Sequence, residues 1–127
     1  MAIARSSLQR GLGIALILAM MAACSPKTPE ANPLDSMTAE QIYGQGELAL
    51  EGKGDAKTNA KKALTYFQDV ERLYPYTEWA KRAVIMQAFT LHKRKNYDES
   101  RSAAQRYIDF YPAGEDMAYA HYLVALS

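Results

Sequence analysis

Two histidines and one cysteine are the side chains of this chain best suited to metal binding or nucleophilic catalysis. His92 precedes the basic run Lys93-Arg94-Lys95, and His121 lies between Tyr119 and Tyr122. A metal site needs several His, Cys, Asp or Glu side chains at ligand spacing, and a catalytic base needs a partner that orients it. Neither histidine has such neighbours in the sequence. We therefore predict no metal site, no cofactor and no catalytic centre.

Other patterns that could indicate catalysis are incomplete. The stretch from Gly46 to Lys53 is faintly similar to a phosphate-binding loop, but Gly54 stands where that loop requires Ser or Thr. No serine lies in a Gly-x-Ser-x-Gly motif. The acidic pairs Asp98-Glu99 and Glu115-Asp116 are placed where helices should begin, and negative charge there offsets the helix dipole. We predict that the protein is not an enzyme and acts by binding; no residue favours the alternative of a cell-wall enzyme.

The N-terminal segment predicts export. Arg5 and Arg10 precede an apolar run from Leu12 to Ala23. This run is too short to span a bilayer, which needs about 20 residues, but it suits the core of a signal peptide. We expect residues 1–23 to be a lipoprotein signal peptide, for the reason given next.

Cys24 is the only cysteine and directly follows the small residues Ala22 and Ala23. The arrangement resembles the bacterial lipobox, with Met21 in place of the commoner leucine. This resemblance implies cleavage before Cys24 and its modification with diacylglycerol and an N-acyl lipid. Ser25, rather than Asp, then implies an outer-membrane address facing the periplasm. The alternative is a buried structural cysteine after an ordinary leader.

Residues 24–36 are expected to form a lipidated, flexible tether, because Pro26, Pro29 and Pro33 interrupt a stretch without hydrophobic periodicity. The membrane would be contacted through the lipid anchor only. A formal net charge of +1 gives no electrostatic footprint for nucleic acid.

The rest of the chain reads as helices. Thr38 and Gln41 form a capping box that opens a helix to about Glu51. Further helices are predicted over about 57–74, from the Thr77 cap to about 92, and over 97–111, where Asn96 and Glu99 match a second capping box. A last helix should begin near Glu115. No stretch alternates apolar and polar residues long enough to indicate strands.

An internal repeat relates these helices, since Tyr74-Pro75 recurs as Tyr111-Pro112, 37 residues later. Ala63 and Ser100 occupy the same small position, while Phe67 is replaced by Ala104. The pattern resembles tetratricopeptide repeats, in which small residues let helices approach closely. We predict an all-α, tetratricopeptide-like α-α solenoid of about two and a half helix pairs over residues 37–127. The third repeat breaks off at Ser127, so we expect a fragment or truncated product with an uncovered apolar end.

First helices line the concave groove of tetratricopeptide arrays, and the candidate peptide-binding residues lie on them. Arg82 could pair with a peptide carboxylate, and aromatic side chains offer contact area at little entropy cost. Core packing is an equal alternative for each aromatic residue. The run His92-Lys93-Arg94-Lys95 could contact lipid headgroups or an acidic partner, or form a solvated turn. The predicted groove residues are Tyr43, Arg82, Phe89, His92, Lys93, Tyr119 and Tyr122.

The sequence also resembles one particular family. Gln41-Ile42-Tyr43-Gly44-Gln45-Gly46, the paired Tyr-Pro motifs and Ala118-Tyr119-Ala120-His121-Tyr122-Leu123 are similar to the outer membrane protein assembly factor BamD family. The resemblance implies a periplasmic scaffold of the β-barrel assembly machinery. Its implied partners are the C-terminal segments of unfolded outer-membrane proteins, the central β-barrel assembly subunit and other assembly lipoproteins. The alternative is another periplasmic repeat adaptor, one that links envelope constriction to peptidoglycan synthesis.

Overall fold

The computed structural model describes residues 32–127, so the predicted signal peptide, Cys24 and the tether up to residue 31 lie outside the described part. Five α-helices follow a short 3-10 helix, and residues 32–127 contain no strand. The elements are η2 (Pro33–Ser36), α2 (Ala39–Glu51), α3 (Ala56–Leu73), α4 (Glu78–Lys93), α5 (Tyr97–Phe110) and α6 (Met117–Leu126).

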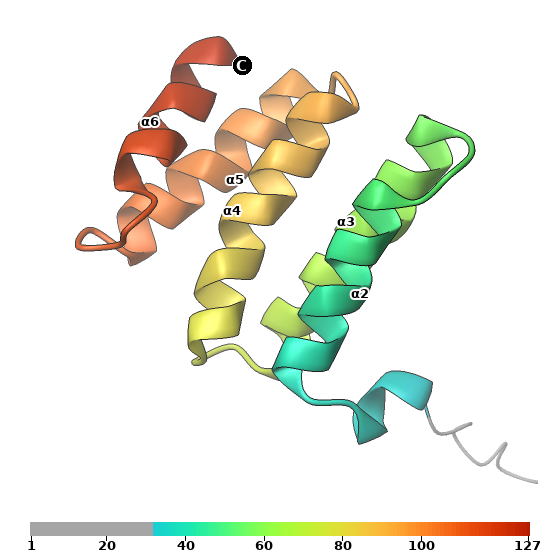
Figure 1. Cartoon of the computed structure of the whole chain (residues 1–127). Coiled ribbons are helices and arrows are strands. Elements are labelled where there is room, and N and C mark those ends of the chain that lie inside the picture. Colours follow the sequence, from blue (N-terminus) through green and yellow to red (C-terminus); the bar gives the residue numbers. More distant parts are fainter. Residues whose placement is uncertain (1–31) are drawn as a thin grey trace, which may run out of the picture. The chain divides into compact units, whose positions relative to one another are not determined.

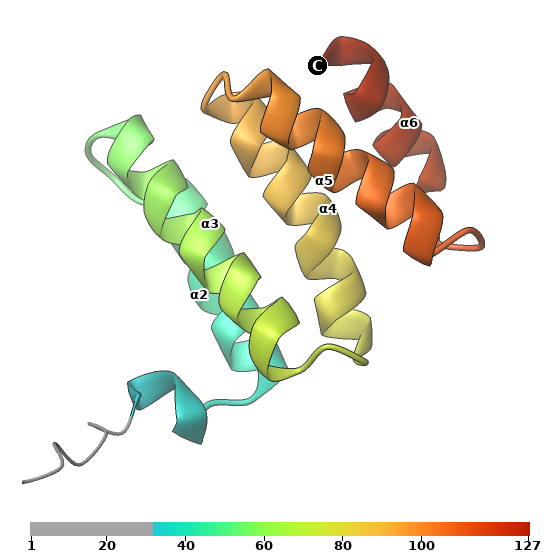
Figure 2. The same ribbon diagram turned by 180° about the vertical axis from the view of Figure 1, so that it is seen from behind.

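Consecutive helices pack side by side, and α4 also contacts both α2 and α6. The first helices of the pairs, α2, α4 and α6, lie on one side, while α3 and α5 lie on the other (Figures 1 and 2). We call the side formed by α2, α4 and α6 the first-helix face. The predicted all-α, tetratricopeptide-like fold is confirmed.

Helix boundaries follow local chemistry in most places. The capping box predicted at Thr38 forms, with the hydroxyl accepting from the Gln41 N–H and the Gln41 side chain accepting from the Thr38 N–H. Thr77 caps α4 in the same way through the Ala80 N–H. At the other ends, Pro75 and Pro112 push Tyr74 and Tyr111 out of helical backbone geometry, and α3 and α5 stop there.

The second predicted capping box does not form. Asn96 has ψ of 70° and makes no side-chain cap for α5; its amide donates to the Glu99 carboxylate instead. The reason is the tight turn before it. Lys95 is in the left-handed region at φ 63°, and the Asn96 N–H reaches back to the Leu91 carbonyl. This holds Asn96 away from the extended geometry that a capping side chain requires.

Small residues mark where the helices cross most closely. Gly46, Ala83 and Ala120 lie 37 residues apart, on successive first helices, and all three are buried. A Cβ atom added to Gly46 would lie 2.6 Å from the Phe67 ring, so this glycine makes room for an aromatic side chain of α3. Ala125, which lies 37 residues after Ala88 and is expected at a close crossing for that reason, is exposed. Of the two small positions that α6 shares with α4, only that of Ala120 is therefore buried.

The buried side chains form two clusters, one centred on α2 and α3 and one on α4, α5 and α6. Tyr107 and Phe67 are the largest fully buried residues. The spacing of Tyr66, Tyr74, Tyr107 and Tyr111 along the repeat predicts all four for the core, but Tyr66, Tyr74 and Tyr111 are only half-buried. Leu123, expected at an uncovered end, is buried against the second cluster.

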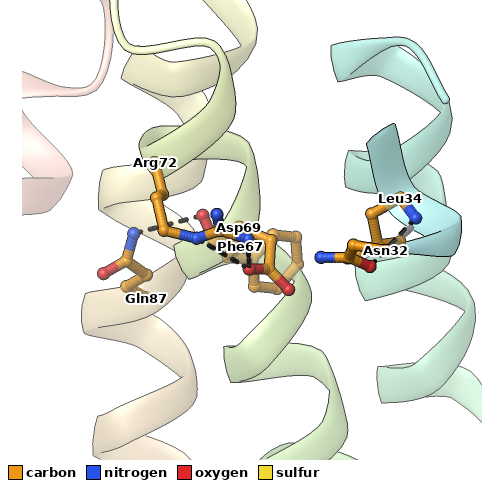
Figure 3. Close-up of polar contacts among 6 residues, drawn as sticks. All are labelled: Asn32, Leu34, Phe67, Asp69, Arg72 and Gln87. Atoms are coloured by element: carbon orange, nitrogen blue, oxygen red, sulfur yellow. Dashed lines mark hydrogen bonds and ion pairs between the residues drawn. The ribbon is translucent and has the colours of Figure 1, made fainter. Parts of the chain in front are cut away.

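A buried amide joins the two helix pairs. The Gln87 side chain of α4 donates to the Phe67 carbonyl of α3 at 3.3 Å (Figure 3) and to the Glu71 carboxylate at 2.8 Å. Arg106 of α5 donates to the same Glu71 at 3.0 Å and to the Gln87 oxygen at 3.1 Å. This network lies across three helices and satisfies polar groups that would otherwise be costly to bury.

The last residues of the predicted tether are helical. Pro33–Ser36 form η2, and the Asn32 side chain accepts from the Leu34 N–H (Figure 3). Leu34 and Met37 pack against the first cluster, and the Tyr74 hydroxyl donates to the Met37 carbonyl at 2.5 Å. Packing of Leu34 thus extends the folded part to a stretch whose prolines predicted a tether.

Candidate functional site

The seven predicted groove residues all lie on first helices, but they differ in exposure. Arg82, Lys93, Tyr119 and Tyr122 are exposed, Phe89 and His92 are half-buried, and Tyr43 is buried. Six of them form three local groups along the first-helix face, described below from α2 to α6, and His92 lies beside the second group.

The first group centres on the only tryptophan of the chain. The Tyr43 ring of α2 lies 5.2 Å from the Trp79 ring of α4, and the Arg82 guanidinium lies 5.2 Å above that indole. Burial is the main cause that raises the pKa of Tyr43, and Glu47 raises it further while Arg82 opposes them. Tyr43 thus packs in the core, and the exposed cation stacks on the aromatic surface.

The second group lies at the C-terminal end of α4. The Lys93 ammonium is 5.5 Å from the centre of the Phe89 ring. The His92 ring lies 5.2 Å from the Tyr97 ring, and the His92 Nδ1 atom lies 3.2 Å from the Ser127 hydroxyl. Phe89 packs partly against the second cluster, and the Lys93 ammonium lies over its ring.

The third group is a pair of stacked rings on α6. The Tyr119 and Tyr122 rings lie 6.1 Å apart at an angle of 25°, with Tyr122 56% exposed. Burial is the main cause that raises the pKa of Tyr119, and Tyr122 adds to the effect. Two exposed, stacked phenol rings are suited to hold an apolar or planar side chain of a ligand.

Trp79 was missed by the sequence analysis, although a signal was present. It precedes Arg82 by three residues, and residues at that spacing share one face of a helix. The spacing of Trp79 and Arg82 would therefore have predicted that these two side chains lie together. The partnership with Tyr43 had no such signal, because it depends on how α2 packs on α4.

The arrangement offers recognition chemistry. Residues 32–127 hold no group of three His, Cys, Asp or Glu side chains that could bind a metal ion. Across the same residues, no helix combines the length and hydrophobicity needed to cross a membrane. The three groups described on the first-helix face combine aromatic rings with cations, side-chain types that bind peptides through stacking, cation–π contacts and carboxylate pairing.

Paired helices and a repeat of 37 residues define a helical-repeat protein of the tetratricopeptide-like class (Figure 1). A family described as YfiO, outer membrane lipoprotein, matches residues 35–127. The chain belongs to this YfiO/BamD family of outer membrane lipoproteins.

Several curated relatives carry the name outer membrane protein assembly factor BamD. One from Caulobacter vibrioides is 30% identical over 87% of this chain and 35% of its own length. A relative from Rickettsia prowazekii is 34% identical over 68% of this chain and 32% of its own length. Another, from Xylella fastidiosa, is 26% identical over 90% of this chain and 38% of its own length. The chain thus spans about a third of the length of these relatives. No solved structure matches it.

Proposed function

We propose that this protein is a scaffold lipoprotein of the machinery that assembles β-barrel proteins in the outer membrane. A lipid on Cys24 holds it at that membrane, facing the periplasm. The first-helix face binds C-terminal segments of unfolded outer-membrane proteins. Its partners in the machinery are the central β-barrel subunit and other assembly lipoproteins. The protein acts by binding and performs no catalysis.

The observation that carries this proposal is the presence of exposed aromatic and cationic side chains on one face of the repeat array. Arg82 stacks on Trp79, and Tyr119 stacks on Tyr122. Aromatic residues and arginine dominate the binding energy of protein interfaces. A guanidinium also suits the terminal carboxylate of a peptide. The name shared by the relatives supports the same role at the outer membrane.

Arg82 provides a sharp test of carboxylate recognition. We expect Arg82→Ala to weaken binding of a C-terminal outer-membrane protein peptide by roughly tenfold, because a charge-assisted hydrogen bond is lost. The same peptide with an amidated C-terminus should bind the wild type and the variant alike. Titration calorimetry measures both, and Lys61→Ala on the exposed surface of α3 is the matched control. If Arg82→Ala weakened binding of the free and the amidated peptide equally, Arg82 would not recognise the terminal carboxylate.

The client can be identified in cells. A photo-crosslinking residue at Tyr122, which is exposed on the first-helix face, should capture unfolded outer-membrane proteins. The same residue at Lys61, on α3, should not. Capture of constriction or peptidoglycan-synthesis proteins at Tyr122 would instead favour the alternative adaptor role.

The anchor is tested separately. Cys24→Ser should abolish incorporation of labelled palmitate and release the protein from outer-membrane fractions, because several acyl chains bind a membrane far more firmly than one. Retained palmitate labelling in this variant would exclude Cys24 as the modified residue.

A further inference from the structure

A cavity with only basic charged residues in its lining lies between the α2–α3 turn and the α4–α5 turn. Both turns are at the end of the helix pairs opposite η2 (Figure 1). Its volume is about 460 Å³. We call it the basic cavity and define it by Gly52, Lys57, Lys93, Arg94 and Lys95. Two turns that are about 40 residues apart in sequence therefore bring four cations to one concavity.

These cations have no ionic partner in the described part of the chain. The three ion pairs found among residues 32–127 use Arg72, Lys81 and Arg106. The Arg94 Nε atom is buried and has no hydrogen-bond partner. Buried donors are normally satisfied, so Arg94, which lines the cavity, keeps unused hydrogen-bonding capacity.

The nearest acidic side chain in the α2–α3 turn is already engaged. Asp55 accepts from the Thr58 N–H at 2.7 Å and from the Thr58 hydroxyl at 2.6 Å, which fixes it as the N-cap of α3. The Asn59 amide donates to the Gly52 carbonyl at 2.5 Å and shapes the turn. The carboxylate is therefore held at the N-terminus of its own helix, where it also interacts with the charge of Lys57, and Lys93, Arg94 and Lys95 are the cations that the other turn supplies.

Lys95 supplies an independent observation. It is held in the left-handed region at φ 63°, a position that helices usually give to glycine. A side chain there costs stability, and such strain concentrates at functional positions. The side chain of Lys95 adds a fourth cation to the cavity.

We propose that the basic cavity binds a phosphate group. Its concave form and volume are within the range of small-ligand sites, which favours a compact anion over an extended acidic segment of a protein. Several lysines and one arginine suit an anionic group with many acceptor oxygens. A free phosphate and the phosphate of a lipid headgroup carry the same recognition chemistry.

The test is an NMR titration of the full 127-residue chain in neutral detergent with inorganic pyrophosphate. Saturable shifts are expected at the amides of residues 52–57 and 93–96. Lys57→Gln/Lys95→Gln should weaken binding roughly tenfold, because two charge-assisted contacts are lost. Lys61→Gln/Lys62→Gln removes the same charge from α3 outside the cavity, and binding should change by less than about twofold. Both pairs are exposed, so unchanged far-UV circular dichroism verifies folding.

A second arm separates the sources of phosphate. Soluble dihexanoyl phosphatidylglycerol is titrated against dihexanoyl phosphatidylcholine, whose headgroup has no net charge. Tighter binding of phosphatidylglycerol than of pyrophosphate assigns a lipid headgroup, and the reverse order assigns a soluble phosphate. The proposal is overturned if neither pyrophosphate nor phosphatidylglycerol gives saturable shifts, or if both lysine pairs weaken binding equally.

Discussion

Lys95 shows how a single backbone angle can decide several local outcomes. Its left-handed conformation ends α4 with the Lys95 N–H donating to the His92 carbonyl. It also turns Asn96 so that the expected capping box cannot form. The same residue contributes a cation to the basic cavity. Glycine would serve the turn better, so stability and charge conflict at this position.

This conflict predicts the effect of a substitution. Lys95→Gly should stabilise the protein by about 1 kcal/mol, because glycine adopts positive φ without steric cost. Urea denaturation followed by circular dichroism measures the change. Lys61→Gly, in the interior of α3, is the matched control and should destabilise by about 1 kcal/mol. A loss of stability in Lys95→Gly would show that the lysine side chain makes contacts that outweigh the strain.

Buried tyrosines predict a loss of stability in alkali. Burial is the main cause that raises the pKa of Tyr107, and it also raises that of Tyr43. Because the unfolded phenols lose their protons near pH 10, the unfolded state binds fewer protons than the folded state above that pH. Stability should therefore be independent of these groups below about pH 10 and fall as pH rises beyond it. In a spectrophotometric titration, the phenols of Tyr107 and Tyr43 should ionise at higher pH in the folded protein than in urea; ionisation at the same pH in both states would contradict the burial.

At the scale of helices, the closest packing depends on the absence of one side chain. Gly46 of α2 lies against the Phe67 ring, whereas Gly44 on the same helix has open space where a Cβ would point. Gly46→Ala should therefore destabilise the protein by about 1 to 2 kcal/mol, since overpacking outweighs the gain in helix propensity. Gly44→Ala should stabilise it by up to about 1 kcal/mol. Thermal unfolding of the two variants decides, and stabilisation by both would mean that Phe67 shifts freely.

The helices could be predicted from the sequence because their signals are local. Thr38, Thr77 and the two Tyr-Pro steps fix boundaries through neighbours within a few residues. The prediction failed at Asn96, where a motif competes with the conformation of the preceding residue. The Glu71–Gln87–Arg106 network could not be predicted from the sequence, because those side chains are far apart in sequence and meet only when three helices pack.

The candidate site was partly predictable for the same reason. Membership of a first helix follows from the repeat, so Arg82 and Tyr122 were placed on the correct helices. Exposure within that helix depends on packing, and Tyr43 is consequently in the core. The basic run at 93–95 was visible, but its convergence with Lys57 required the α2–α3 turn to lie beside the α4–α5 turn.

At the scale of the whole folded part, α4 is the central element. It packs against each of the other four α-helices and has buried residues along its whole length, whereas α6 buries only Ala120 and Leu123. Helical repeat arrays are stabilised by neighbouring repeats, and local opening follows the number of buried contacts. Native-state hydrogen exchange should therefore be slowest for amides in the middle of α4 and fastest among the helices for those of α6. Equal protection of α4 and α6 would indicate a single cooperative unit.

The junction at the start of the folded part has a mechanical consequence. Tyr74, at the end of α3, is hydrogen-bonded to Met37, directly before α2 begins, and Leu34 is packed beside them. Tension applied at Asn32 is therefore shared between two antiparallel helices and cannot unravel α2 alone. Such a joint resists pulling until the hydrogen bond and the packing fail together, so a load at this end meets the helix pair as one unit.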